Sequence, residues 1–524
     1  MKIALIQPPA WGVYGPPAGL AQLSACLKQA DYAAKLFDMN VFLYNRRSER
    51  YKNSWAIEQS GFWCSPKNVK AFFEDSKTAF EEFITGVVEY KPEMICFSVN
   101  VCSWHSTLLT AGIIKKLLPG AAIVIGGPVF LVPFDTEYYL ANREIDVLVY
   151  GEAEQTLVEL GSALSNMKEL DKCAGIAFKR AESTVKTEPR PFIRDLDSLP
   201  FMDLSDTPFG DYDPPGHMGR HISIMTSRGC VQQCVFCGPR KYWPGFRTMS
   251  GKRIYNEIEY HFKADPGIKH IEFLDLLLNG KMDTLIEFCC LMARGNLKSR
   301  LEWHANLIVR KEMSEDVFRQ MAAAGCTHVT FGIESGSQKV LAAMKKHYRI
   351  EDADAALANA HKAGIQVTCN FMFGFPGETR DDFNQTLEFL KRNRSHITIA
   401  YPSRTFCTIE PYSYMNEHVN EFDMVVNPHH GQYWASKDGK NNYIERMSRC
   451  EEFSRVAGEL GVDIGLGLQT SYELDHWLNL GDYYSCMGEV HRALECFEKY
   501  LQLDPSNVVV RGKLDTIKTS GRAR

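Results

Sequence analysis

Along the first 150 residues, short apolar runs alternate with stretches of helical pattern. The runs are rich in β-branched and aromatic residues and lead directly into Gly, Pro, Ser or Asn. They are IALIQ (3–7), AAKLFDM (33–39), MICFSVN (94–100), AIVIGG (122–127) and VLVYG (147–151). This alternation predicts a doubly wound parallel sheet. The small and polar residues after the strands predict a ligand-binding edge at their carboxyl ends.

A second alternating series begins near residue 220. Its six apolar runs are HISIMTS (221–227), HIEFLDL (270–276), LEWHANL (301–307), THVTFGI (327–333), QVTCNFMFG (366–374) and ITIAYPS (397–403). Helical patterns such as KRIYNEIEYHF separate them. Six strand–helix units predict a partial barrel whose active face lies at the carboxyl ends of the strands.

These patterns predict an α/β chain in five parts. A doubly wound domain (1–180) is followed by a linker rich in charge and proline (181–219), the partial barrel (220–405), an aromatic-rich region that closes the barrel (406–455) and a helical tail (456–524). The closing region is suited to a lipid, a tetrapyrrole or a natural-product intermediate, whereas the helical tail suggests a peptide or protein substrate, and the sequence does not choose among them.

The tail resembles one tetratricopeptide repeat. The residues at the repeat's offsets are Trp477, Leu480, Gly481, Tyr484, Ala493, Phe497 and Pro505. One repeat cannot bury its own apolar face, so the tail either caps the barrel or a neighbouring chain, or recognises a protein partner.

Composition narrows the class of protein. Lys and Arg total 59 against 64 Asp and Glu, a formal net charge of -5, which gives no reason to expect a nucleic-acid or anionic-membrane surface. The longest charge-free stretch (117–134) is interrupted by proline and glycine, and this argues against a transmembrane helix. The apolar run at the amino terminus is too short for a signal peptide, so we expect a cytoplasmic protein whose 16 cysteines are reduced.

Three cysteines stand within eight residues, as Cys230, Cys234 and Cys237 in the spacing C-x3-C-x2-C. Structural zinc would require a fourth protein ligand, for which His217 or His221 is the nearby candidate. Alternatively, the three cysteines pack independently as small buried hydrophobic residues. A 4Fe–4S cluster normally takes four cysteines, so three leave one iron open to an exogenous chelating ligand.

This spacing, with the aromatic Phe236 inside the second interval, resembles the motif of the radical S-adenosylmethionine (SAM) enzymes. The resemblance implies that SAM chelates the open iron through its amino and carboxylate groups. It also implies reductive cleavage of SAM to methionine and a 5′-deoxyadenosyl radical, with Phe236 near the adenine.

The same resemblance suggests further SAM contacts. HIEFLDL points to Asp275 at the SAM amino group, although the second acid that the family often has next is Leu276 here. FGIESG points to Glu334 at the ribose and carboxylate. FMFGFPGET resembles the turn beside adenine, formed by Gly374, Pro376 and Gly377. The alternatives are a turn cap for Asp275, a helix-start carboxylate for Glu334 and an ordinary tight loop for the glycines.

The amino-terminal segments QPPAWGVYGPPAGL, IGGP and DVLVYGEAEQTLVEL resemble the cobalamin-binding domain of a radical SAM subclass. The resemblance implies cobalamin at Ser98, Gly126 and Gly127, without the histidine loop that ligates cobalt in the methionine-synthase type. His105 is the nearby candidate for cobalt, or a structural histidine. The glycines also allow a generic nucleotide site, but no GxGxxG follows the first strand.

Taken together, the resemblance implies a cobalamin-dependent radical SAM enzyme that methylates an unactivated carbon. Its cofactors would be a 4Fe–4S cluster, SAM and cobalamin, with an electron donor such as flavodoxin or ferredoxin. A non-methylating cyclase, oxidase or rearrangement enzyme is the alternative, and a degenerate scaffold protein is a third possibility. Cys289 and Cys290 are expected to pack in the core, and His304 is either a core histidine or a site residue.

Overall fold

The protein is described by a computed structural model. It covers residues 1–524 except 57–58, 132–133, 165–166, 182, 215–218, 240–242, 298, 404–405, 428–429, 466–471 and 521–524. Two compact units are present. The first comprises 1–228, 247–275 and 294–303, and the second 229–246, 276–293 and 304–524.

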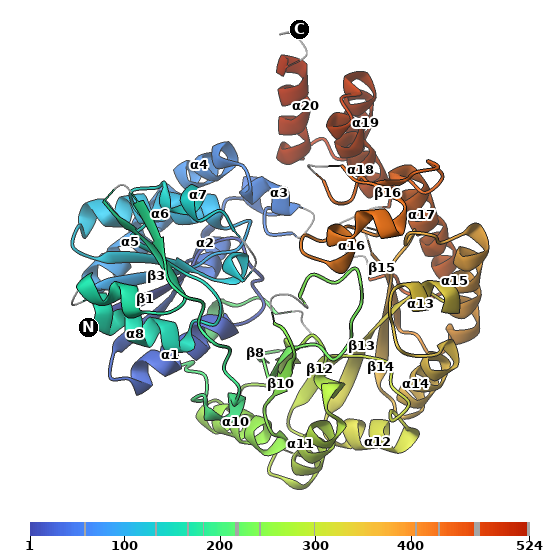
Figure 1. Cartoon of the computed structure of the whole chain (residues 1–524), viewed down its shortest axis with the longest axis horizontal. Coiled ribbons are helices and arrows are strands. Elements are labelled where there is room, and N and C mark those ends of the chain that lie inside the picture. Colours follow the sequence, from blue (N-terminus) through green and yellow to red (C-terminus); the bar gives the residue numbers. More distant parts are fainter. Residues whose placement is uncertain are drawn as a thin grey trace. The chain divides into compact units, whose positions relative to one another are not determined.

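The first unit contains a seven-stranded sheet in the order β2-β1-β3-β4-β5-β6-β7 (Figure 1). Its strands are β1 (Lys2–Gln7), β2 (Ala33–Asp38), β3 (Met94–Ser98), β4 (Ala122–Gly126), β5 (Val147–Val149), β6 (Ile176–Arg180) and β7 (Ser183–Lys186). The first five, which the sequence predicts, pair in parallel. β6 and β7 add an antiparallel edge that the pattern does not indicate, so the sheet is mixed.

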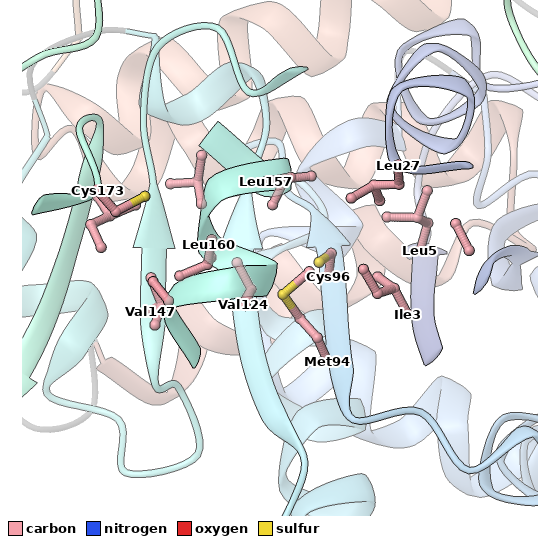
Figure 2. Close-up of a cluster of buried hydrophobic side chains, with 14 of the residues drawn as sticks. Ile3, Leu5, Leu27, Met94, Cys96, Val124, Val147, Leu157, Leu160 and Cys173 are labelled. Atoms are coloured by element: carbon pink, nitrogen blue, oxygen red, sulfur yellow. The ribbon is translucent and has the colours of Figure 1, made fainter. Parts of the chain in front are cut away.

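One face of this sheet is covered by α1 (Ala18–Gln29) and α8 (Glu154–Leu164). Figure 2 shows Leu27, Leu157 and Leu160 from these helices over strand residues such as Ile3 and Val124, all of them buried. Burying each leucine contributes about 2 kcal/mol. The strands read as continuous apolar runs because both faces of a parallel sheet are covered.

A helical insert lies between β2 and β3. Its helices are α2 (Met39–Arg46), α3 (Ser60–Trp63), α4 (Pro66–Asp75) and α5 (Lys77–Tyr90). The strand–helix alternation continues with α6 (Trp104–Leu117) and α7 (Thr136–Leu140). α4 packs against both α5 and α6, so the insert is attached to the body of the first unit.

The segment predicted as a linker is tightly bound to the first unit. Its Asp203 accepts a hydrogen bond from Ser24 Oγ at 2.6 Å, and Tyr212 donates to Asp38 at 2.8 Å. β7 also falls within this range. A segment rich in charge and proline is therefore ordered here by specific polar contacts.

The six strands predicted for the barrel form one sheet in the order β15-β14-β13-β12-β11-β8. They are β8 (His221–Ile224), β11 (His270–Phe273), β12 (Glu302–Leu307), β13 (Cys326–Glu334), β14 (Gln366–Phe371) and β15 (Ile399–Pro402). The helices are α10 (Gly251–Ala264), α11 (Met282–Arg294), α12 (Glu315–Ala323), α13 (Gln338–Ala343), α14 (Ile350–Lys362) and α15 (Arg380–Asn393). Sequential strand order with β8 and β15 at the edges confirms the partial barrel.

Most strands end earlier than predicted, and β8, β11 and β14 do so by three residues each. The first predicted run divides into β8 and β9 (Ser227–Gly229), and β9 pairs with β10 (Phe246–Thr248). The chain leaves β8 because the Thr226 N–H bonds to the Asp275 carboxylate. β14 ends before Gly374, where φ is +73°.

The carboxyl-terminal region is mainly helical. It contains α16 (Tyr414–Glu417), the short pair β16 (Met424–Val425) and β17 (Ala435–Ser436), then α17 (Tyr443–Glu459), α18 (Tyr472–Cys486), α19 (Val490–Leu503) and α20 (Val508–Ser520). α18 packs on α19 and α19 on α20, with Gly481 against the ring of Phe497. The tetratricopeptide assignment stays a prediction. None of the described helices has the length and apolarity needed to cross a bilayer.

Candidate functional site

The three motif cysteines lie on the loop that follows β9, in the second unit. Cys230, Cys234 and Cys237 are all half-buried. The middle of the loop is held on both sides, because Val235 N donates to Met344 O at 3.1 Å and Val235 O accepts from Met415 N at 3.0 Å. The Val235 side chain is 1% exposed in an apolar cluster. The backbone of the cysteine loop is therefore fixed by the barrel and by the segment after it.

Gly229 makes the cysteine loop possible. Its φ is +84°, and a Cβ at this position would lie 1.7 Å from the carbonyl oxygen of Gly245. No other residue fits such a close backbone approach. The glycine directly before Cys230 is thus a structural requirement of the loop.

Lys346 brings a positive charge to the cysteines. Its ammonium group donates to Gly332 O and lies 3.2 Å from Glu334 Oε1, with both side chains at most 15% exposed. Burial raises the pKa of Cys230 and Cys234, and the charge of Lys346 opposes this rise. Glu334 itself has φ +66° at the end of β13, beside a shift in strand register. The predicted residue Glu334 and the unpredicted Lys346 therefore share the environment of the cysteines.

The glycine–proline turn after β14 is clamped by residues from beyond the barrel. A Cβ on Gly374 would lie 2.2 Å from Arg446 Cγ. Asn441 Nδ2 donates to Gly374 O at 2.9 Å, and Gly374 N donates to Glu378 at 2.5 Å. Glu378 is paired with Arg449 at 2.9 Å, yet burial raises the pKa of this glutamate to about 7. The turn thus has a built-in support from α17.

The other residues predicted for this side of the site vary in exposure. Pro376 is buried and Gly377, with φ +80°, is exposed with open space where a Cβ would lie. Phe236 is half-buried and packs against the apolar cluster around Val235. Gln232 Oε1, in the cysteine loop, is a buried acceptor without a hydrogen bond in the described structure.

Asp275 lies in the first unit and is 1% exposed. Its Oδ2 accepts from Thr226 N at 3.1 Å and its Oδ1 accepts from Thr226 Oγ at 3.0 Å, with further hydrogen bonds from Ser227. Burial nevertheless raises the pKa of Asp275 to about 6. In this arrangement Asp275 holds the chain that leads to the cysteine loop, which is the turn-capping role. Its contact with SAM stays a prediction.

The residues predicted for cobalamin meet at the carboxyl edge of the seven-stranded sheet. Ser98 and Gly126 are register partners on β3 and β4. Gly127 has φ +114°, and a Cβ there would lie 2.6 Å from Val99 N. The close approach of the two strand ends explains why both positions are small.

The same edge holds polar atoms that no protein group satisfies. Within the described chain, Gln7 Nε2 at the end of β1, Trp11 Nε1 in the loop after it and Ser106 Oγ in the first turn of α6 are buried without hydrogen bonds. An unpaired buried donor costs about 1–3 kcal/mol. Three such atoms at one edge suit a polar ligand that fills the site.

A buried ion-pair network flanks the cysteine loop from within the first unit. Arg228 and Arg247 both lie 2.9 Å from Glu152 Oε1, and Arg228 also pairs with Glu154. All four side chains are at most 12% exposed. Glu152 Oε2 further accepts from Ile193 N at 2.7 Å. The turn after β5 thus anchors the residues just before and after the loop.

The remaining candidates lie elsewhere. His221 is buried against Gly15 and lies 4.0 Å from Glu272, and His217 lies outside the described residues. His105, on α6, and His304, on β12, are half-buried. No three His, Cys, Asp or Glu side chains of the described residues are grouped as they would be around a metal ion. Cys289 is buried as expected, and Cys290 is half-buried with its sulfur near Gln320.

Sequence reasoning missed four kinds of contributor. Lys346 follows Glu334 by twelve residues, and the two adjacent lysines of the run KKHY mark a positive charge close to it in sequence. Arg446 and Asn441 act from a distant segment and gave none. The acids of GEAE gave a weak signal, since two glutamates directly after a buried strand need partners. The unpaired atoms of the sheet edge depend on packing alone.

Comparisons with known proteins agree with this geometry. Residues 224–390 match the radical SAM superfamily. A protein of Pyrococcus horikoshii described as an uncharacterised methyltransferase is 28% identical over 418 residues, which cover 77% of this chain and 81% of that protein. The anaerobic magnesium-protoporphyrin IX monomethyl ester cyclase of Cereibacter sphaeroides is 26% identical over 66% of this chain, which spans only 57% of the cyclase.

A solved structure extends the similarity to nearly the whole chain. The radical SAM methyltransferase TsrM of Kitasatospora setae, with cobalamin and a 4Fe–4S cluster bound, superposes with a TM-score of 0.63 at 16% identity, covering 95% of this chain and 99% of TsrM. The same enzyme with tryptophan and a SAM analogue bound gives 0.65, covering 90% and 92%. At this identity the likeness defines the fold. Residues 224–390 therefore form a radical SAM domain, and the chain as a whole has the fold of TsrM.

Proposed function

We propose that this protein is a cobalamin-dependent radical SAM enzyme that methylates an unactivated carbon. The observation that carries the proposal is the cysteine loop, which holds three half-buried cysteines in the C-x3-C-x2-C spacing on a fixed backbone. The methyltransferase relative from Pyrococcus, which covers most of both chains, supports methyl transfer.

In this proposal Cys230, Cys234 and Cys237 hold a 4Fe–4S cluster. Bound there, the cluster and SAM supply a carbon radical, chemistry that no acid–base pair of the chain can provide. Glu334, oriented by Lys346 at 3.2 Å, is assigned to bind polar groups of SAM. Asp275 is assigned to the SAM amino group, in addition to its role in holding Thr226.

The proposed adenine site is formed by four predicted residues. Phe236 supplies an apolar surface, and Gly374, Pro376 and Gly377 supply a turn without bulky side chains. Open space at Gly377 supports this assignment, because an aromatic ligand requires close approach to backbone.

Cobalamin is assigned to the carboxyl edge of the seven-stranded sheet. Ser98, Gly126 and Gly127 provide the small residues that a long nucleotide tail needs. The unpaired Gln7 Nε2 and Trp11 Nε1 are donors that such a tail would satisfy. A protein histidine from the loop after β1 takes no part, since QPPAWGVYGPP contains none.

A non-methylating radical reaction is the second candidate. The similarity to the magnesium-protoporphyrin cyclase favours it, although the chain spans 57% of that enzyme. For either reaction we assign the protein to the cytoplasm, with flavodoxin or ferredoxin as electron donor. The tail from α18 to α20 is the proposed site of a protein partner.

Anaerobic reconstitution tests the proposal. The full chain is loaded with iron, sulfide and hydroxocobalamin, desalted, reduced with dithionite and given SAM. We expect a 4Fe–4S absorbance, retained cobalamin, and both 5′-deoxyadenosine and S-adenosylhomocysteine as products. Deoxyadenosine without S-adenosylhomocysteine favours the second candidate. A loaded cluster that cleaves no SAM refutes both, and the Cys230→Ala, Cys234→Ala, Cys237→Ala variant is the blank.

A further inference from the structure

Two cysteines far from the motif lie against each other in the first unit. Cys64 Sγ and Cys102 Sγ are 4.0 Å apart, although 38 positions separate them in the chain. Neither belongs to the cysteine loop or to the residues assigned to SAM. The pair joins the helical insert to the loop between β3 and α6.

The backbone on the Cys64 side is held by aromatic packing. Cys64 directly follows α3, whose last residue Trp63 is fully buried and donates from Nε1 to Ser54 O at 2.6 Å. The Trp63 ring lies 4.7 Å from the ring of Trp55 and 5.1 Å from that of Phe72. The position of Cys64 is therefore set by the core of the insert.

The backbone on the Cys102 side is held by a polar turn. Asn100 N donates to Ser103 Oγ at 2.9 Å, and Ser103 N donates to Asn100 Oδ1 at 2.7 Å. Asn100 Nδ2 also donates to Ala10 O at 3.1 Å. α6 begins two residues after Cys102, and α4, which begins two residues after Cys64, packs on it. Both cysteine backbones are therefore held in place. The two thiols are thus brought together by two segments whose backbones are fixed.

The two thiols differ in access and acidity. Cys64 is exposed, whereas Cys102 is half-buried. The hydrogen bond with Cys102 lowers the pKa of Cys64 to about 7 and raises that of Cys102. A thiolate is the attacking species in disulfide exchange, so Cys64 is the reactive member and Cys102 the resolving one.

We propose that Cys64 and Cys102 form a reversible disulfide when the protein meets a low-molecular-weight disulfide such as oxidised glutathione. Cys64 attacks one glutathione sulfur, breaks the S–S bond and releases one glutathione thiolate. Cys102 then loses its proton and attacks Cys64 Sγ, releasing the second. The protein loses two electrons and two protons, and oxidised glutathione is reduced to two thiols.

Closing the bond requires the sulfurs to move from 4.0 Å to about 2 Å. Rotation of the Cys64 side chain supplies most of this movement, because Cys64 is the exposed member of the pair. The bond fixes the loop after β3 to the insert. That loop starts directly after Ser98, so oxidation changes the freedom of the ligand-binding edge of the sheet.

The test uses the full chain, kept anaerobic and treated with oxidised glutathione, then alkylated and digested for mass spectrometry. We expect a peptide pair joined through Cys64 and Cys102, loss of alkylation at both of these cysteines, and its recovery with dithiothreitol. In Cys102→Ser, Cys64 should accumulate as a glutathione adduct instead. Cys486, half-buried beside Asn427, is the comparison thiol and should give only an adduct.

One result overturns the inference without any variant. If Cys64 of the unaltered chain carries glutathione while Cys102 is still alkylated as a free thiol, the pair does not resolve. Cross-linking of Cys64 to any other cysteine overturns it equally. Circular dichroism of Cys102→Ser shows whether the variant keeps its fold. The readout needs neither cluster nor cobalamin, so it is independent of the proposed enzymatic function.

Discussion

Replacing Glu152 by glutamine tests whether the buried ion pairs with Arg228 and Arg247 stabilise the fold. Glu152 is 6% exposed and faces Arg228 and Arg247 at 2.9 Å each. Glutamine keeps the size of the side chain and removes its charge. Arg228 keeps Glu154, but Arg247 loses its only carboxylate among the described contacts.

The expected cost follows from the burial of these groups. Removing one partner of a buried pair destabilises by about 3–5 kcal/mol, because the other charge stays buried without compensation. The matched control is Asp171→Asn in the same unit, where Asp171 pairs with Arg180 at 2.7 Å and both side chains are about half exposed. An exposed pair contributes about 0–1 kcal/mol, so this variant should unfold almost as the unaltered chain does.

Urea unfolding of the reduced, cluster-free chain, followed by tryptophan fluorescence and circular dichroism, measures both variants. A further variant that combines Glu152→Gln with Arg247→Met should recover part of the loss, since the unpaired cation is removed. If Glu152→Gln costs no more than Asp171→Asn, the network does not stabilise the fold. The reasoning from burial would then be wrong.

Three other changes test separate parts of the structure. Gly229→Ala should abolish iron loading, because its Cβ would lie 1.7 Å from a carbonyl oxygen. The control Gly245→Ala, where φ is +77° but the space is open, should retain most of the iron. Equal iron contents in the two variants would contradict the clash. Lys346→Met should slow alkylation of Cys230 and Cys234 at pH 8, because the charge of Lys346 lowers the pKa of both thiols. The control Lys345→Met, at an exposed neighbouring position, should leave the rate unchanged. An unchanged rate in Lys346→Met would show that Lys346 does not act on these cysteines. Burial raises the pKa of Asp38 from 3.8 to about 6, so stability falls by about 3 kcal/mol as pH rises from about 4 to about 6. In urea titrations, the stability of Asp38→Asn should not show this fall between about pH 4 and about pH 6. If the variant and the unaltered chain show the same pH dependence, Asp38 is not its cause.

The strands could be predicted because a strand buried on both faces is a short run of apolar residues, which is visible in the local sequence. Every apolar run that predicts a strand of the two large sheets contains one. β6 and β7 could not, because an edge hairpin is half exposed and short. Strand ends were misjudged where a side chain captured the backbone, as Asp275 does at Thr226.

The site could be predicted only where its residues are close in sequence. The cysteine spacing and the small residues Gly126 and Gly127 are local features. The support of Gly374 by Arg446 joins the turn after β14 to α17, and no periodicity links these two positions. The contact between Cys64 and Cys102 depends in the same way on how the insert packs.

The clamp on Gly374 sets a lower limit on the length of a working chain. A protein shortened after β15 would keep every strand of the partial barrel but lose Asn441 and Arg446. The freed Gly374 carbonyl and the emptied space beside its Cα would let the turn relax. A catalytic fragment cut from this protein, or grafted onto another, must therefore extend to Glu459 at the end of α17.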